Sequence, residues 1–194
     1  MLFIMFIFGH SFVKRAFGPG RSTTSICVDG EDVILDSFGE GGLTLDRVLQ
    51  NPSRYIGMMK IIGPRILILD LGTNDLCSAE PTTVLRNFRI FFAELRRAGV
   101  APTAIFLLPV LPRTKAYAGA ALSLSEFNLR VERLNKLLFE ESLHTDMLFV
   151  WEHRSLSDAP HHIFDGVHLD ERGRELYRRT LRRIGSFSKR HFWE

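Results

Sequence analysis

The 194-residue chain contains only two cysteines, Cys27 and Cys77, and they lie far apart in the sequence. They have no metal-ligand spacing, and two residues cannot form the disulfide framework of a small secreted domain. The composition therefore favours a reducing compartment. We expect an intracellular, cytoplasmic protein.

The sequence also lacks a long apolar segment. Its first eight residues, MLFIMFIF, are apolar, but Gly9 ends a run that is too short to cross a bilayer. No basic residues precede this run and no small-residue cleavage site follows it, so it does not resemble a secretory signal. We expect no transmembrane segment and interpret the run as a buried strand.

The sequence has no large excess of positive or negative residues, and its net charge is +3. The imbalance is concentrated from Asp170 onward, where eight Lys or Arg residues stand against four Asp or Glu residues. A basic helix in this region could contact nucleic acid or an anionic surface. A solvated helix face is the commoner explanation of such a charge run.

Two widespread functional motifs are absent. The segment GPGRST has neither the lysine nor the spacing of a phosphate-binding P-loop. Residue 13 is valine, so Ser11 does not lie in the G-x-S-x-G turn of α/β-hydrolases. Neither P-loop nucleotide binding nor the α/β-hydrolase fold is supported.

Short apolar runs alternate with helical patterns along the chain. Strands are predicted over 2–8, 65–71, 103–110 and 146–151, and over one or both of 22–28 and 32–38, which flank Asp29-Gly30. Helices are predicted over 80–98, 125–142 and about 170–184. This alternation predicts an α/β protein with a doubly wound parallel sheet. We expect one domain over residues 1–185, followed by a short basic and aromatic tail at 186–194.

Four loops contain the residues that are candidates for function. They are Gly9-His10-Ser11, the glycine-rich 39–42, GTND at 72–75 and DGVH at 165–168. In a doubly wound sheet the functional site lies beyond the carboxyl ends of the strands, so we expect these loops to meet at one edge.

The four loops contain the groups that a nucleophilic serine requires. Ser11 would need a general base, for which an imidazole oriented by a carboxylate is the usual solution. Asp165 and His168 are three residues apart, so a tight turn could join them. Backbone N–H groups of the glycine cluster and the amide of Asn74 could stabilise the oxyanion of an acyl-transfer transition state.

Taken in order, FGHS, GGLT, GTND and DGVH resemble the four sequence blocks of the SGNH, or GDSL-type, hydrolases, over residues 6–176. LLPVLPR followed by FNLRVERLNKLL further resembles the platelet-activating-factor acetylhydrolase-like branch. The resemblance implies a flavodoxin-like three-layer αβα sandwich. It also implies a Ser11–His168–Asp165 triad and an oxyanion hole formed by the N–H groups of Ser11 and Gly42 and the side chain of Asn74.

The same resemblance implies a serine esterase. The complete triad and the lack of a metal-ligand cluster in the sequence predict that it needs no metal or cofactor. Its substrate is expected to be a small acetyl-like ester of a lipid or an acetylated carbohydrate. One position departs from the family pattern, because His10 stands where the family usually has aspartate. We expect that His10 is not the catalytic base, because neighbouring side chains at a strand end diverge and no orienting carboxylate is near it in the sequence. His10→Asp is expected to keep or improve activity.

Two alternatives remain. The segment HHIFDGVH combines His161 and His162 with Asp165 and His168, which suggests a metal site, although no cysteine or second carboxylate cluster supports one. The chain could also be an SGNH-like domain of mobile-element origin, weakly active or inactive, that binds nucleic acid or lipid through its basic last helix. Against loss of activity stands the presence of all five triad and oxyanion residues.

Overall fold

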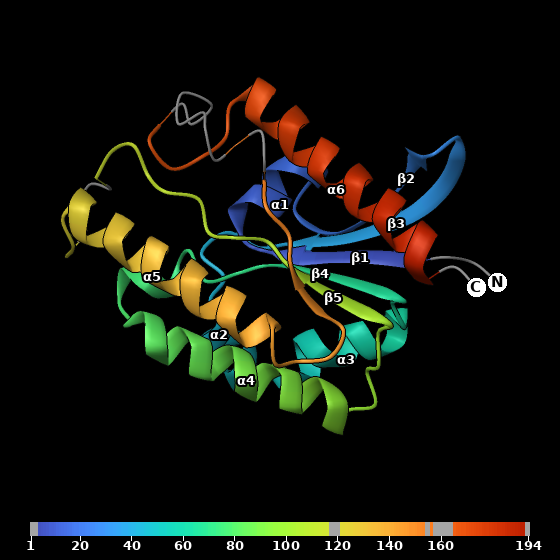
Figure 1. Cartoon of the computed structure of the whole chain (residues 1–194), viewed down its shortest axis with the longest axis horizontal. Helices are drawn as coiled ribbons and strands as arrows, with labels where there is room; N and C mark the ends of the chain where they lie inside the picture. Colours follow the sequence, from blue (N-terminus) through green and yellow to red (C-terminus); the bar gives the residue numbers. More distant parts are fainter. Residues whose placement is uncertain (1–3, 117–120, 154–155, 157–164, 193–194) are drawn as a thin grey trace.

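A six-stranded, mostly parallel sheet runs through the middle of the molecule, and helices cover both of its faces (Figure 1). This computed structural model describes residues 4–116, 121–153, 156 and 165–192. The strands are β1 (Ile4–Gly9), β2 (Gly20–Val28), β3 (Glu31–Gly39), β4 (Ile66–Asp70), β5 (Ala104–Leu107) and β6 (Leu148–Val150). Their order in the sheet is β2-β3-β1-β4-β5-β6. The predicted three-layer α/β architecture is confirmed.

The β2–β3 hairpin is the antiparallel part of the sheet. Asp29 and Gly30, which connect the two strands, both have positive φ, of 50° and 81°. A two-residue hairpin turn with positive φ at both positions matches the twist of the flanking strands. Both runs beside Asp29-Gly30 are therefore strands, and β2 lies at the edge of the sheet.

Seven helical segments are described: α1 (Ser11–Phe17), α2 (Leu45–Gln50), α3 (Pro52–Ile62), η1 (Asp75–Cys77), α4 (Pro81–Arg97), α5 (Leu124–Ser142) and α6 (Glu171–Phe192). The predicted bounds of α4 and α5 agree with the structure to within one residue at each end. No described helix combines the length and the apolar character needed to span a membrane.

The expected end of the last helix at Ile184 is wrong, because α6 continues to Phe192. Residues 186–192, expected to form part of a tail, are helical. Phe187 packs against the rings of Phe106 and Trp151, with ring centroids 6.0 and 5.2 Å apart. The apolar face of the helix therefore extends past Gly185.

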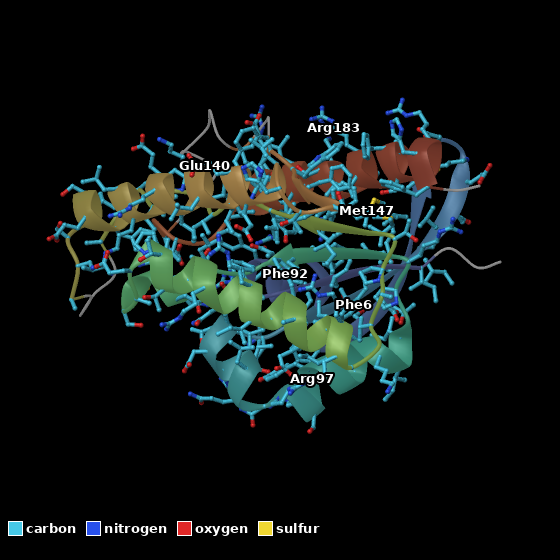
Figure 2. All side chains as sticks on the ribbon, turned by 60° about the horizontal axis from the view of Figure 1, so that its bottom comes forward. Phe6, Phe92, Arg97, Glu140, Met147 and Arg183 are labelled. Carbon is cyan, nitrogen blue, oxygen red and sulfur yellow. The ribbon has the colours of Figure 1, made fainter. Side chains whose placement is uncertain are left out.

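Two hydrophobic layers hold the sheet between the helices. Phe6 and Phe8 of β1 belong to the layer under α2, α3, α4 and α5, whereas Met5 and Ile7 belong to the layer under α1 and α6. All four side chains are fully buried, as expected for a parallel strand covered on both faces. Figure 2 labels Phe6 and Phe92 of the first layer, and also the exposed charged residues Arg97, Glu140 and Arg183 at the outside of the molecule.

The strand order places a crevice beside β1. β3 pairs with β1 on one side, and β4, the next strand in the sequence, pairs with β1 on the other side. In doubly wound sheets ligands bind at such a reversal, beyond the carboxyl ends of the strands. His10 and Ser11 directly follow β1, and Asn74 follows β4 by four residues. The sheet thus brings two of the candidate loops together.

Candidate active site

Ser11 is the first residue of α1, and only His10 separates it from the end of β1 at Gly9. This abrupt change of direction requires Gly9, since a Cβ there would lie 2.5 Å from the Asp70 carbonyl oxygen and 2.7 Å from the Val13 side chain. The first N–H groups of a helix have no acceptor within the helix. Accordingly, the Ser11 N–H donates to no acceptor among the described residues. It remains available to a ligand.

The glycine and asparagine loops adjoin Ser11. Gly42 has a positive φ of 71°, and its N–H, too, donates to no acceptor in the described part of the chain. Asn74 donates from Nδ2 to the Leu43 carbonyl oxygen at 3.0 Å, which ties its loop to that of Gly42. Because a side-chain amide has two N–H donors, the second remains for a ligand.

Asp75 supports this arrangement from inside the protein. Its Oδ1 accepts a hydrogen bond from the Leu45 N–H at 2.8 Å, so GTND is linked to the start of α2 as well as to Leu43. Burial raises the pKa of Asp75 to about 6, although the hydrogen bond from Leu45 lowers it. Asp75 thus fixes the backbone, while its neighbour Asn74 faces the candidate site.

The turn at 165–168 joins Asp165 to His168. Asp165 Oδ2 lies 2.7 Å from His168 Nδ1, and its Oδ1 accepts from the backbone N–H groups of Val167 and His168, at 2.9 and 2.6 Å. Burial raises the pKa of Asp165, but the hydrogen bonds from His168 and Val167 outweigh it and bring the pKa to about 2. The ionised carboxylate holds a proton on Nδ1 and leaves Nε2 of His168 as an acceptor.

Ser11, Gly42, Asn74 and His168 line one pocket of about 860 Å³. Within it, the structure does not join Ser11 to His168. Among the described residues the hydrogen-bond partner of Ser11 Oγ is His10, whose Nδ1 is 3.3 Å away. Catalytic hydrogen bonds are often long or absent without substrate and tighten in the substrate complex.

The expected divergence of His10 from Ser11 is wrong, and a carboxylate that is distant from His10 in the sequence lies beside it in the fold. His10 is 1% exposed, and its Nε2 lies 3.1 Å from Asp70 Oδ1. The two atoms are in contact, but their geometry does not meet the criteria of a hydrogen bond. Gly9 pairs with Asp70 between β1 and β4, which places Asp70 beside His10.

A residue of α6 fixes the position of the Asp70 carboxylate. Tyr177 donates its hydroxyl to Asp70 Oδ2 at 2.6 Å. Burial raises the pKa of Asp70, but the adjacent His10 and the hydrogen bond from Tyr177 outweigh it, so the pKa is below its usual value. Burial and the Asp70 charge raise the pKa of Tyr177 well above 10. A chain of contacts therefore runs from the partly buried Ser11 through the buried His10 and Asp70 to a neutral Tyr177.

One sequence signal could have pointed to Asp70. It is an acidic residue within the apolar run RILILDL, and an acid in a buried strand requires a partner. What the sequence could not show was which residue that partner is, because strand pairing determines it.

The residues of the alternative metal site are only partly described. His161 and His162 lie outside the described residues. Within the part of the chain that the structure describes, no three His, Cys, Asp or Glu side chains are grouped so that they could hold a metal ion. Asp165 and His168 instead bond to each other.

Comparison with known proteins shows similarity in structure and not in sequence. No protein-family model matches the chain, and comparison with curated proteins gives no match. A carbohydrate esterase of family 3 from Talaromyces cellulolyticus superposes with a TM-score of 0.67, over 94% of this chain and 96% of that one, at 14% identity. An acetylxylan esterase from Geobacillus stearothermophilus gives a TM-score of 0.67 over 93% and 92% of the two chains, at 12% identity.

A member of the lipolytic G-D-S-L family from Veillonella parvula gives a TM-score of 0.64, over 96% of this chain and 99% of that one, at 17% identity. The chain thus has the fold of the SGNH, or GDSL-type, hydrolases, as the sequence resemblance predicts.

Proposed function

We propose that this protein is a serine esterase of the SGNH type that hydrolyses small, acetyl-like esters. The proposal is carried by one observation: Ser11, Gly42, Asn74 and His168 line a single pocket at the carboxyl ends of β1 and β4. The same fold occurs in a carbohydrate esterase and an acetylxylan esterase, which supports the ester bond and the acetyl group as first candidates.

In this proposal Ser11 Oγ attacks the ester carbonyl carbon and His168 Nε2 accepts the serine proton. The Asp165 carboxylate, 2.7 Å from Nδ1, keeps the ring in the required tautomer and stabilises the imidazolium. His168 then gives the proton to the leaving alcohol, and a water molecule activated by the same ring releases the acyl group from Ser11. The ring of His168 must move to within hydrogen-bond distance of Ser11 when substrate binds.

The developing oxyanion is the second requirement. The N–H groups of Ser11 and Gly42 and the second N–H of Asn74 are the proposed donors. Each is uncharged and held by the backbone or by a hydrogen bond, so it needs no reorganisation when the charge forms. Loss of one such donor typically lowers kcat by about 10²–10³.

His10 has a different proposed role from His168. The Asp70 charge favours a proton on Nε2 of His10, which leaves Nδ1 free to accept from the Ser11 hydroxyl. Because His10 is 1% exposed, it cannot follow the proton to a leaving group in the pocket. We therefore assign proton transfer to His168 and orientation of the serine hydroxyl to His10.

The test combines hydrolysis with covalent labelling. p-Nitrophenyl acetate, butyrate and octanoate are assayed with and without EDTA, and a fluorophosphonate probe is followed by intact mass. We expect acetate to be the best substrate, EDTA to have no effect, and one label that Ser11→Ala abolishes. Ser53→Ala, which removes an exposed hydroxyl at the start of α3, is the matched control. Absence of both labelling and turnover, or zinc-restored activity after EDTA, would contradict the proposal.

The binding-module alternative stays a prediction. Some cations of α6 are engaged within the chain: Arg182 pairs with Glu175 at 2.5 Å and Lys189 with Glu31 at 2.7 Å. Salt-sensitive binding of nucleic acid or anionic vesicles, without turnover of any ester, would favour this alternative.

A further inference from the structure

The pocket around Ser11 has an uneven charge. Four cationic side chains line it, and none of the described lining residues is Asp or Glu; the cations are Lys14, Arg15, Arg113 and Lys115. Exposed lysines at the rim of a pocket are ordinary. Arg113 is different, because only 9% of it is exposed.

The backbone of Arg113 is fixed by α5. The Arg113 N–H donates to Asn128 Oδ1, and its carbonyl oxygen accepts from Asn128 Nδ2, both at 2.9 Å. Asn135 holds Val110 by the same pair of bonds, also at 2.9 Å each. These two clamps connect LLPVLPR to FNLRVERLN, so the segment carrying Arg113 cannot shift independently of the helix.

The guanidinium of Arg113 is held in place but has no counter-ion among the described residues. Its Cζ lies 3.8 Å from the centroid of the Phe127 ring, and one terminal nitrogen donates to Cys77 Sγ at 3.2 Å. Its Nε is buried and has no hydrogen-bond partner. No carboxylate of the described residues forms an ion pair with it.

A buried charge without a counter-ion destabilises a fold. An anionic ligand in the pocket would compensate this charge when it binds. The planar guanidinium is suited to bidentate recognition of carboxylate and phosphate groups. Stacking on Phe127 and the clamp on the backbone fix its orientation in advance, which reduces the entropy lost on binding.

We propose that Arg113 binds an anionic group of the ester substrate, a carboxylate or a phosphate, and that the enzyme therefore prefers acidic esters to neutral ones. The inference rests on the proposed function, because it assigns a substrate class to the same pocket. Lys14 and Lys115 lie at the exposed part of the lining and increase the attraction of an anion toward the pocket.

The test uses esters that differ in charge and share the acetyl group. Phenyl acetate is compared with 3-carboxyphenyl acetate, 3-phosphonooxyphenyl acetate and the cationic 3-(trimethylammonio)phenyl acetate. We expect kcat/KM for at least one anionic ester to exceed that of phenyl acetate by about tenfold. This is the gain in affinity that one charge-assisted hydrogen bond provides. The cationic ester should be the poorest. The differences should shrink as ionic strength rises.

Arg113→Gln should bring the ratio of anionic to neutral kcat/KM close to one. Lys136→Gln removes the same charge from an exposed position on α5, where Lys136 is 4.0 Å from Glu140, and should leave the ratio unchanged. If Arg113→Gln does not fold, Arg113→Met removes the charge and keeps an unbranched chain that can lie on Phe127. The proposal would be overturned if wild-type protein had the same kcat/KM for anionic and neutral esters. It would also be overturned if the folded Arg113 variant kept the wild-type ratio of the two values.

Binding to the Ser11→Ala variant separates this proposal from the proposed function. Calorimetric titration with 3-carboxyphenyl acetate and phenyl acetate needs no turnover. Tighter binding of the anionic ester that disappears in Ser11→Ala/Arg113→Gln supports the anion site even if wild-type protein hydrolyses no ester. Equal binding of the two esters contradicts the site even if wild-type protein is an active esterase.

Discussion

The His168–Asp165 pair and the His10–Asp70 pair both adjoin the pocket that contains Ser11 and are built in different ways. The first forms within four consecutive residues, and its side chains are 21% and 36% exposed. The second joins the ends of β1 and β4, with side chains 1% and 6% exposed. The exposed pair has the shorter internal contact, 2.7 Å against 3.1 Å, yet the buried pair is the one in contact with Ser11.

The difference shows that proximity to the nucleophile does not by itself identify the base. A base in acyl transfer takes a proton from the serine and later gives it to a leaving group in the pocket, so its ring must reach both. A ring that orients the hydroxyl must instead stay still. Sheet pairing and Tyr177 hold His10 in place, whereas His168 belongs to a turn and its side chain is 21% exposed.

The largest expected effect follows from removing the exposed pair's imidazole. His168→Ala should lower kcat by about 10³-fold or more, as loss of a triad base does elsewhere, with little change in thermal midpoint because the side chain is partly exposed. His144→Ala, at an exposed position after α5, is the control. If His168→Ala stays active and a His10 variant does not, the two roles must be exchanged.

The effect of an Asn74 variant can be compared with those of the His168 and His10 variants, because it changes neither imidazole. Asn74→Ala should lower kcat by about 10²–10³ with KM little changed, because its donated bond strengthens in the transition state. Loss of the bond to Leu43 should cost stability of about 1 kcal/mol. Steady-state kinetics and the thermal midpoint are measured on one preparation. A large drop in midpoint with near-normal kcat would return Asn74 to a structural role.

The buried pair should show a smaller kinetic effect and a larger effect on stability. His10→Asn removes the ring beside Asp70, so we expect kcat to fall by about tenfold and stability by about 1–3 kcal/mol. His10→Asp should be less stable than His10→Asn, since a second carboxylate would then lie beside the buried Asp70. The expectation that His10→Asp keeps or improves activity stays a prediction, and kcat of the same variant tests it.

Tyr177→Phe tests the buried pair without changing either of its members, because it removes only the hydroxyl that holds Asp70. It is informative even if the His10 variants do not fold. We expect a reduction in kcat of a few fold, less than for His10→Asn, together with a lower thermal midpoint. Unchanged kcat in both His10→Asn and Tyr177→Phe would show that the buried pair serves the fold alone.

The smallest expected effect concerns acid stability of the exposed pair. Asp165 has a folded-state pKa of about 2, below its ordinary value of 3.8, so its contribution is complete above pH about 4 and is lost as the pH falls toward 2. The difference in thermal midpoint between wild type and Asp165→Asn should therefore be present at neutral pH and diminish below pH about 4. A difference that persists unchanged at pH about 2 would contradict the pairing with His168.

The sequence was sufficient where structure depends on neighbours along the chain. The periodicity of Val84, Phe88, Phe91 and Leu95 defined α4, because residues three and four apart lie on one helix face. The short helices α1, α2 and α3 were not predicted, since few turns give little periodicity. Gly185 interrupts the pattern of α6, but a Cβ there would lie 2.8 Å from Val28, so this glycine serves close packing within a helix that continues.

In the candidate site, too, contacts between neighbours in the sequence could be predicted and contacts between distant residues could not. The pairing of Asp165 with His168 could be predicted because a tight turn is enough to join residues three apart. The pairing of His10 with Asp70 could not be predicted, because strand register decides it. Nor could the burial of Arg113 away from every described carboxylate, because packing against α5 decides it. Sequence alone determined the chemical groups available to this protein. Only the tertiary structure decided which of them are buried together, because burial and pairing depend on residues far apart in the chain.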